Sequence, residues 1–125
     1  MPIFNDFGPL AIQAAGGDTI NLFTASDVVA PGNNSRVIAL LDAGPDSRQA
    51  ISFQIVFATA PTAVVEIFGS NFPPTSAGPV NGIILFTSTN TQNASYTDNS
   101  SFRFYWAQLV SQTAGGALQV LAHVN

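Results

Sequence analysis

The strongest pattern in the chain is an alternation of apolar and polar residues with a period of two. This pattern is typical of β-strands that bury one face. It is clearest over residues 50–58 (AISFQIVFA), where large apolar residues occupy every second position. No segment carries apolar residues at i, i+3 and i+4 over ten or more positions, so no helix is predicted. Strands are predicted over residues 19–25, 36–42, 50–58, 62–68, 82–89, 102–110 and 117–124.

Turn-forming residues separate these segments. Clusters of Pro, Gly, Asn and Thr occur at residues 31–34, 60–62 and 113–116, and such clusters favour turns. Residues 71–81 hold three prolines and residues 90–101 are polar without periodicity, so both are predicted to be loops. Turn signals at this spacing predict an all-β fold, namely an antiparallel two-sheet β-sandwich or jelly roll of about seven to eight strands.

The chain of 125 residues has the usual length of one domain. Residues 1–17 are predicted to be an extended N-terminal arm, because two prolines disfavour a regular element and Gly16-Gly17 ends the segment. Residues 18–125 are predicted to form the sandwich. The arm is apolar, so we expect it to pack either along its own domain or on a neighbouring subunit. Its apolar residues are Ile3, Phe4, Phe7, Leu10 and Ile12.

Charged residues are scarce. They make up 8% of the chain, against roughly a quarter in an average soluble domain. The chain has three arginines, no lysine and a net charge of −4, so it lacks the cations that neutralise phosphates. We therefore expect neither nucleic acid nor an anionic membrane surface as a partner.

Other features exclude further classes of protein. The chain has no cysteine, which removes disulfides and cysteine-ligated metal. A transmembrane helix needs roughly 18 apolar residues, and the longest apolar run is Val37–Leu41. The first residues carry no basic region and no continuous apolar stretch, so no signal peptide is predicted.

Candidate catalytic residues are few. A nucleophile–histidine–acid triad needs a histidine held between two partners, and the only histidine, His123, is predicted to face solvent or an interface from the last strand. Glu66 is the only glutamate; it lies mid-strand and is expected to be exposed or paired with Arg103. Paired carboxylates for glycoside hydrolysis are therefore not expected. We predict that the protein is not an enzyme and uses no cofactor.

One acidic loop has the oxygen ligands that calcium prefers. Asp42, Asp46 and Ser47 lie within six residues of one another, but their spacing is also that of an ordinary turn. The turn is the favoured interpretation, and no metal site is predicted.

The aromatic segment 102–110 allows two interpretations. Phe102, Phe104 and Trp106 share one face, which is predicted to be core. Tyr105 is then placed on the outer face with Leu109, where it could stack on a sugar. This leaves a lectin-like module as an alternative function.

Several outer strand positions are apolar, and Leu109 is expected to be among them. A patch of apolar residues on an outer face marks an interaction surface, and few charges keep copies apart. A homo-oligomer is therefore predicted, with a trimer favoured. The predicted interface comprises Ile3, Phe4, Phe7, Leu10, Ile12, Phe23, Val56, Val64, Phe68 and Leu121.

Two segments resemble a known class of protein. They are the strand-turn-strand segment Gln49–Asn71 and the closing segment Phe102–Val124, whose Gly-rich turn leads into a short final strand. Together they are similar to small β-sandwich structural proteins of tailed bacteriophages, especially capsid decoration (cement) proteins. The resemblance includes no invariant motif.

The resemblance implies a trimeric or dimeric sandwich bound to the major capsid protein on the outer capsid surface. Such a protein stabilises the shell of a virion assembled in the host cytoplasm, and the N-terminal arm would contact the capsid or a neighbouring copy. Another virion component remains an alternative: a neck, tail or fibre-base protein, or a small jelly-roll coat subunit.

Overall fold

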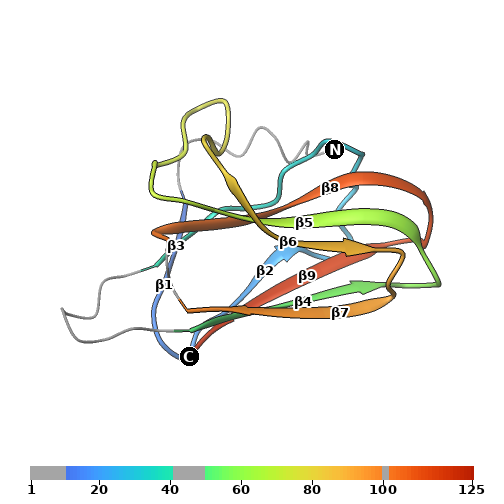
Figure 1. Cartoon of the computed structure of the whole chain (residues 1–125), viewed down its shortest axis with the longest axis horizontal. Helices are drawn as coiled ribbons and strands as arrows, with labels where there is room; N and C mark the ends of the chain where they lie inside the picture. The colour runs from blue at the N-terminus through green and yellow to red at the C-terminus, as the bar shows by residue number, and fades with distance from the viewer. Residues whose placement is uncertain (1–10, 41–49, 100–101) are drawn as a thin grey trace.

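Two stacked β-sheets form the molecule (Figure 1). The computed structural model describes residues 11–40, 50–99 and 102–125. One sheet has the strand order β1-β3-β8-β5-β6 and the other β2-β9-β4-β7. All pairs are antiparallel except β1–β3, so the predicted all-β sandwich is confirmed. The strands are β1 (Ile12–Ala14), β2 (Thr19–Phe23), β3 (Ile38–Leu40), β4 (Ile51–Phe57), β5 (Thr62–Ser70), β6 (Ile83–Thr89), β7 (Asn93–Asp98), β8 (Phe104–Ala114) and β9 (Leu118–Val124).

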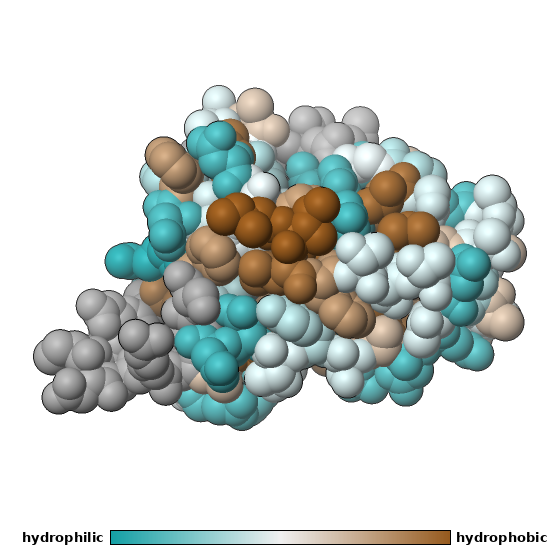
Figure 2. Space-filling view, in the orientation of Figure 1, coloured by the Kyte–Doolittle hydropathy of each residue, from teal (hydrophilic) through white to brown (hydrophobic). Residues whose placement is uncertain are grey.

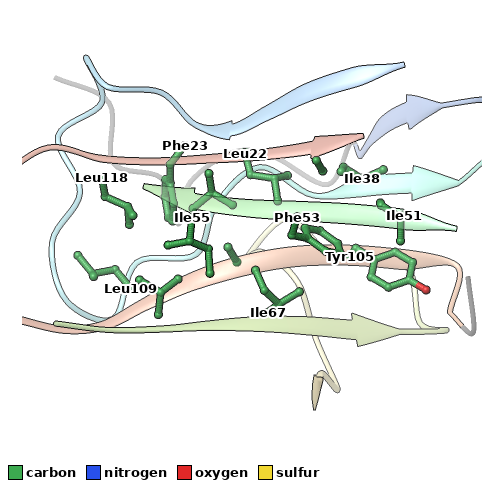
Figure 3. Close-up of a cluster of buried hydrophobic side chains, with 14 of the residues drawn as sticks. Leu22, Phe23, Ile38, Ile51, Phe53, Ile55, Ile67, Tyr105, Leu109 and Leu118 are labelled. Carbon is green, nitrogen blue, oxygen red and sulfur yellow. The ribbon is translucent and has the colours of Figure 1, made fainter. Parts of the chain in front are cut away.

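The core lies between the two sheets and follows from the period-two pattern. On β4, every second side chain from Ile51 to Phe57 is at most 2% exposed. Figure 3 shows Ile55 pointing from β4 toward Leu109 of the opposite sheet. Burying each such side chain contributes about 1.5–3 kcal/mol, so the alternation holds the sheets together without disulfide bonds.

The polar segment 90–101 contains a strand that the sequence analysis missed. β7 pairs with β4 along its whole length, so the prediction of a loop here is wrong. The pattern does alternate, because Ala94 and Tyr96 are half-buried while Ser95 is exposed. Only two residues of the strand are apolar, and this weak contrast concealed the period of two.

The described end of the predicted arm belongs to the sandwich. β1 pairs in parallel with β3, and Ala14 is fully buried. The sandwich therefore includes Ile12–Ala14 and does not begin at residue 18. With β1 and β7 the strands within the described residues number nine, more than predicted. The predicted interface residues Ile3, Phe4, Phe7 and Leu10 lie outside the described residues.

A β-bulge on β2 changes the direction of Phe23. Asn21 pairs with Leu121 and Phe23 with the adjacent Val120, so Leu22 is an extra residue in the strand. Such a residue shifts the alternation that follows it. Leu22 and Phe23 are both fully buried, so the prediction that Phe23 lies on the outer face is wrong.

The two faces of β8 are the reverse of those predicted. Tyr105 and Leu109 are fully buried in the core between the sheets, whereas Trp106 and Phe104 lie on the opposite face of the strand. The size of the rings predicts the wrong face for this strand. The Tyr105 hydroxyl is accommodated in the core because it has polar partners there.

A hydrogen-bond cluster joins the two sheets at Tyr105. Its hydroxyl donates to Asp98 Oδ2 at 2.5 Å and accepts a bond from the Phe102 N–H at 3.1 Å. Tyr96 donates to the other carboxylate oxygen of Asp98 at 3.0 Å. Burial, and then the hydrogen bond to Asp98, raises the pKa of Tyr105 well above its ordinary value. Asp98 lies on β7 and Tyr105 on β8, so this cluster links the layers.

Replacing Tyr105 with Phe should lower the free energy of unfolding by about 1–3 kcal/mol, the usual cost of leaving buried polar partners without a hydrogen bond. Urea unfolding followed by far-UV circular dichroism would measure the loss. Tyr96→Phe is the matched control, since Tyr96 bonds the same carboxylate from a half-buried position and should cost less. Equal losses in the two variants would contradict the assignment.

Candidate interaction surface

The predicted interface residues do not form a single surface. Val64 and Phe68 lie on the outer face of the five-stranded sheet, and both are half-buried. Val56 and Leu121 lie on the outer face of the four-stranded sheet. Ile12, 39% exposed, lies on β1 at the edge opposite β6. Any association through all of them would require more than one contact surface.

The outer face of the five-stranded sheet carries a row of apolar side chains that crosses three strands. Phe68 on β5 pairs with Ile84 on β6 and with Trp106 on β8. The rings of Phe68 and Trp106 are stacked, with centroids 5.5 Å apart and planes 5° apart. Ile84 at the open end of the row is 54% exposed, as is the neighbouring Ile83.

We call the group Phe68, Ile83 and Ile84 the β6 patch. Phe68 and Ile84 lie on the outer face, whereas Ile83 pairs with Gly69 and is exposed on the other side of the strand, at the open edge of the sheet. Figure 2 shows a hydrophobic area over the strand that carries the two isoleucines. Phe72, which follows the end of β5 by two residues, is 58% exposed. Exposed residues of this size gathered at one end of a hairpin are typical of a binding surface rather than of scattered surface positions.

The loop of residues 71–82 covers the inner end of this row. Trp106 lies on the outer face of the sheet and is nevertheless only 4% exposed. The backbone of Gly82 lies close to the indole, since a Cβ there would be 2.5 Å from Trp106 Cζ2. Asn71 Oδ1 accepts a hydrogen bond from the Arg103 N–H at 3.1 Å, which holds the start of the loop on the sheet.

A second surface is a shallow depression of about 350 Å³ on the outer face of the four-stranded sheet. His123 and Thr19 meet there through a hydrogen bond of 2.8 Å between His123 Nδ1 and Thr19 Oγ1. His123 is exposed, as predicted. The lining offers hydroxyl, amide and imidazole groups but no carboxylate. The lining residues are Thr19, Ser52, Phe53, Gln54, Ser95, Leu121 and His123.

The remaining candidate groups are not gathered into a site. Glu66 is half-buried and accepts a hydrogen bond from Thr87 Oγ1 at 3.2 Å. Its expected pairing with Arg103 is wrong: within the described ranges the ion pair is Arg36–Asp27, at 2.8 Å. Glu66 lies beside Gln108 in the middle of β8, whereas Arg103 precedes the start of that strand.

Among residues 11–40, 50–99 and 102–125, no three His, Asp or Glu side chains are arranged to hold a metal ion. The predicted turn with Asp42 and Asp46 lies outside the described residues. The described part of the chain contains no helix long and apolar enough to cross a membrane.

The β6 patch contains residues that the sequence analysis missed. The sequence pattern predicts a strand over residues 82–89, but Ile83 and Ile84 are not among the predicted interface residues. The signal was present in the run Gly-Ile-Ile-Leu-Phe at residues 82–86, where consecutive apolar residues must face both sides of a strand. Only the strand order shows that β6 lies at an edge, where such residues remain uncovered.

Comparison with known proteins gives no relative for this chain: no family model, curated protein or solved structure matches it. The interpretation of its surfaces therefore depends on their own geometry and chemistry.

A Gly82→Ala substitution should detach the loop of residues 71–82 from Trp106, because the added methyl group would overlap the indole. The chain contains one tryptophan, so its fluorescence reports this site alone. We expect a red shift of the emission and stronger quenching by acrylamide, with the far-UV circular dichroism unchanged. Ser76→Ala, at an exposed position in the same loop, is the control. Unchanged emission in Gly82→Ala would show that the glycine is not required for this packing.

Proposed function

We propose that the protein is a structural component of a virion: a capsid decoration protein that binds the outer capsid surface as a homo-oligomer and stabilises the shell. The observation that carries the proposal is the β6 patch, an exposed apolar surface on a small sandwich with few charges. The resemblance of residues 49–71 and 102–124 to decoration proteins of tailed phages adds the viral context. The major capsid protein is the proposed partner.

The patch is suited to weak contacts that are repeated many times. Ile83 and Ile84 are each about half exposed, so covering either one would contribute about 1 kcal/mol, half the value for burying a whole side chain. Such a contribution is small for one copy. On a lattice of identical sites and in an oligomer, several contacts act together, and the total affinity rises steeply.

Two alternative functions would use different surfaces of the molecule. Another virion component (a neck, tail or fibre-base protein, or a jelly-roll coat subunit) would use the same apolar surface with a different partner. A lectin-like module through Tyr105 is disfavoured, since that ring is fully buried. The depression at His123 does not replace it, because its one aromatic lining residue, Phe53, is 1% exposed and offers no ring for stacking on a sugar.

The expectation that the chain is not an enzyme stays part of the proposal. His123 bonds Thr19 at 2.8 Å, but the lining of its depression includes no acid that could orient the imidazole. A triad requires such an orienting group. Turnover of any substrate by the purified protein would contradict this part of the proposal.

Sedimentation velocity at micromolar concentration should show a homo-oligomer. Replacing both Ile83 and Ile84 with Thr keeps the β-branched shape and removes apolar surface, so we expect self-association to weaken by at least about tenfold. Val28→Thr is the matched control, because Val28 is 53% exposed and lies on the connection between β2 and β3. A wild-type chain that stays monomeric would count against the proposal.

Location in a virion needs a separate measurement. Antibodies against the purified protein, visualised with gold in negative-stain images of particles from the source, should label the outer capsid surface in a regular array. Labelling confined to a tail, neck or fibre would favour the alternative virion component. Label found only in soluble material would contradict a virion role.

A further inference from the structure

The two sheets have four edges, and three of these edges are protected against pairing with another chain. β1 has three residues. β2 is interrupted by the bulge at Leu22 and follows Asp18. β7 has no bulge, but its outer face is polar and its one charged residue, Asp98, points inward. Short strands, bulges and charges are the usual means by which proteins block edge-to-edge pairing.

β6 is the edge strand with the most exposed large apolar side chains. It has seven residues, none of them charged, and it begins with the exposed pair Ile83 and Ile84. A bulge at Leu85 interrupts its pairing with β5, since Ile67 pairs with Phe86 and Phe68 with Ile84. From Phe86 to Thr89 the register is regular, so this part of the strand can accept a further strand.

The backbone N–H and C=O groups on one edge of β6 are available for hydrogen bonds to another strand. Within the described residues, β6 pairs with β5 alone, and no backbone hydrogen bond reaches its other edge. The hydroxyl of Thr91 donates to the carbonyl of Thr89 at 3.0 Å, which marks the end of the available edge. A strand added here would satisfy the remaining N–H and C=O groups, as in recognition by β-strand addition.

The charge distribution favours a second copy of this chain as the added strand. No charged residue occurs between Glu66 and Asp98, so two copies with a net charge of −4 each can meet at β6 with little repulsion. The nearest acid, Glu66, lies one strand inside the edge. In a continuous sheet the two Glu66 residues would be about 14 Å apart, three strand spacings. That separation exceeds the Debye length of about 8 Å at physiological salt.

We propose that β6 pairs antiparallel with β6 of a second copy, so that the two five-stranded sheets become one continuous sheet with a two-fold axis. Such a contact is isologous and closes on itself, which predicts a dimer and not the trimer favoured from the sequence. This inference rests on the proposed function in one respect, since both require that the chain self-associates through β6. It adds the way in which the two copies pair.

Cysteine cross-linking tests the pairing directly. The chain has no cysteine, so one introduced at Thr87 or Thr89, both exposed, is the only thiol. Antiparallel partners lie about 4.5–5.5 Å apart at Cα, within reach of a disulfide. We consider registers centred on residues 87–89 in which the outer faces of the two copies lie on the same side of the joined sheet. These registers place residue 87 opposite residue 87, residue 89 opposite residue 89, or residue 87 opposite residue 89.

We therefore expect Thr87→Cys, Thr89→Cys or their equimolar mixture to form covalent dimer on mild oxidation, measured by non-reducing electrophoresis and mass spectrometry. The yield should exceed that of Ser95→Cys by at least tenfold, since Ser95 is an exposed residue of the edge strand β7. Yields equal to that control in all three samples would overturn the pairing.

Two further measurements separate this inference from the proposed function. If the chain self-associates and loses association on Ile83→Thr/Ile84→Thr, but no cysteine sample cross-links, the pairing is wrong and the proposed function stands. If deletion of residues 1–10 abolishes association while the cysteines stay unlinked, the arm is the contact and the pairing is again overturned. A monomeric wild-type chain would count against both.

Discussion

Burial of alternate side chains between two sheets is the constraint on which the rest of the structure depends. Once β4 and β9 direct every second residue toward β5 and β8, the other residues must face outward, whatever their polarity. In most sandwiches charged residues fill those positions. This chain has few charges to place there, so its outer faces carry hydroxyl, amide and apolar groups instead.

The same constraint explains why polar groups enter the interior at only a few points. Asp98 is 9% exposed and is held by two tyrosine hydroxyls. Ser35, 1% exposed, accepts a bond from the Ala107 N–H and donates to the carbonyl of Arg36, both at 2.8 Å. Buried polar groups are tolerated where they have such partners. Both residues contact β8, the long strand to which the smaller elements are attached.

The sequence predicts the fold class well, because strong alternation, as over residues 50–58, reports burial on one face. It predicts the directions of individual side chains less well. The bulge at Leu22 reverses the alternation without any signal in composition, and Phe23 was therefore misplaced. On β8, ring size suggested the wrong face because the partner of the Tyr105 hydroxyl, Asp98, belongs to a strand that was not predicted.

The candidate surface was only partly predictable for a related reason. Phe68 was identified as an outer apolar residue, whereas Ile83 and Ile84 were not. Exposure of those two depends on β6 being an edge strand, which is a property of the strand order and not of the local sequence. Likewise, Trp106 is buried by the loop of residues 71–82, and no periodicity in the chain predicts where that loop lies.

The positions of β1 and β6 at opposite edges of one sheet have a consequence for the reach of the molecule. If two copies join at β6, the two β1 strands become the outermost members of a ten-stranded sheet, nine spacings or up to about 43 Å apart. The Ile12–Ala14 strands of the two copies then lie at the two far edges of the dimer. A dimer built in this way would hold its two β1 strands at a separation that is set by the number of strands in the joined sheet.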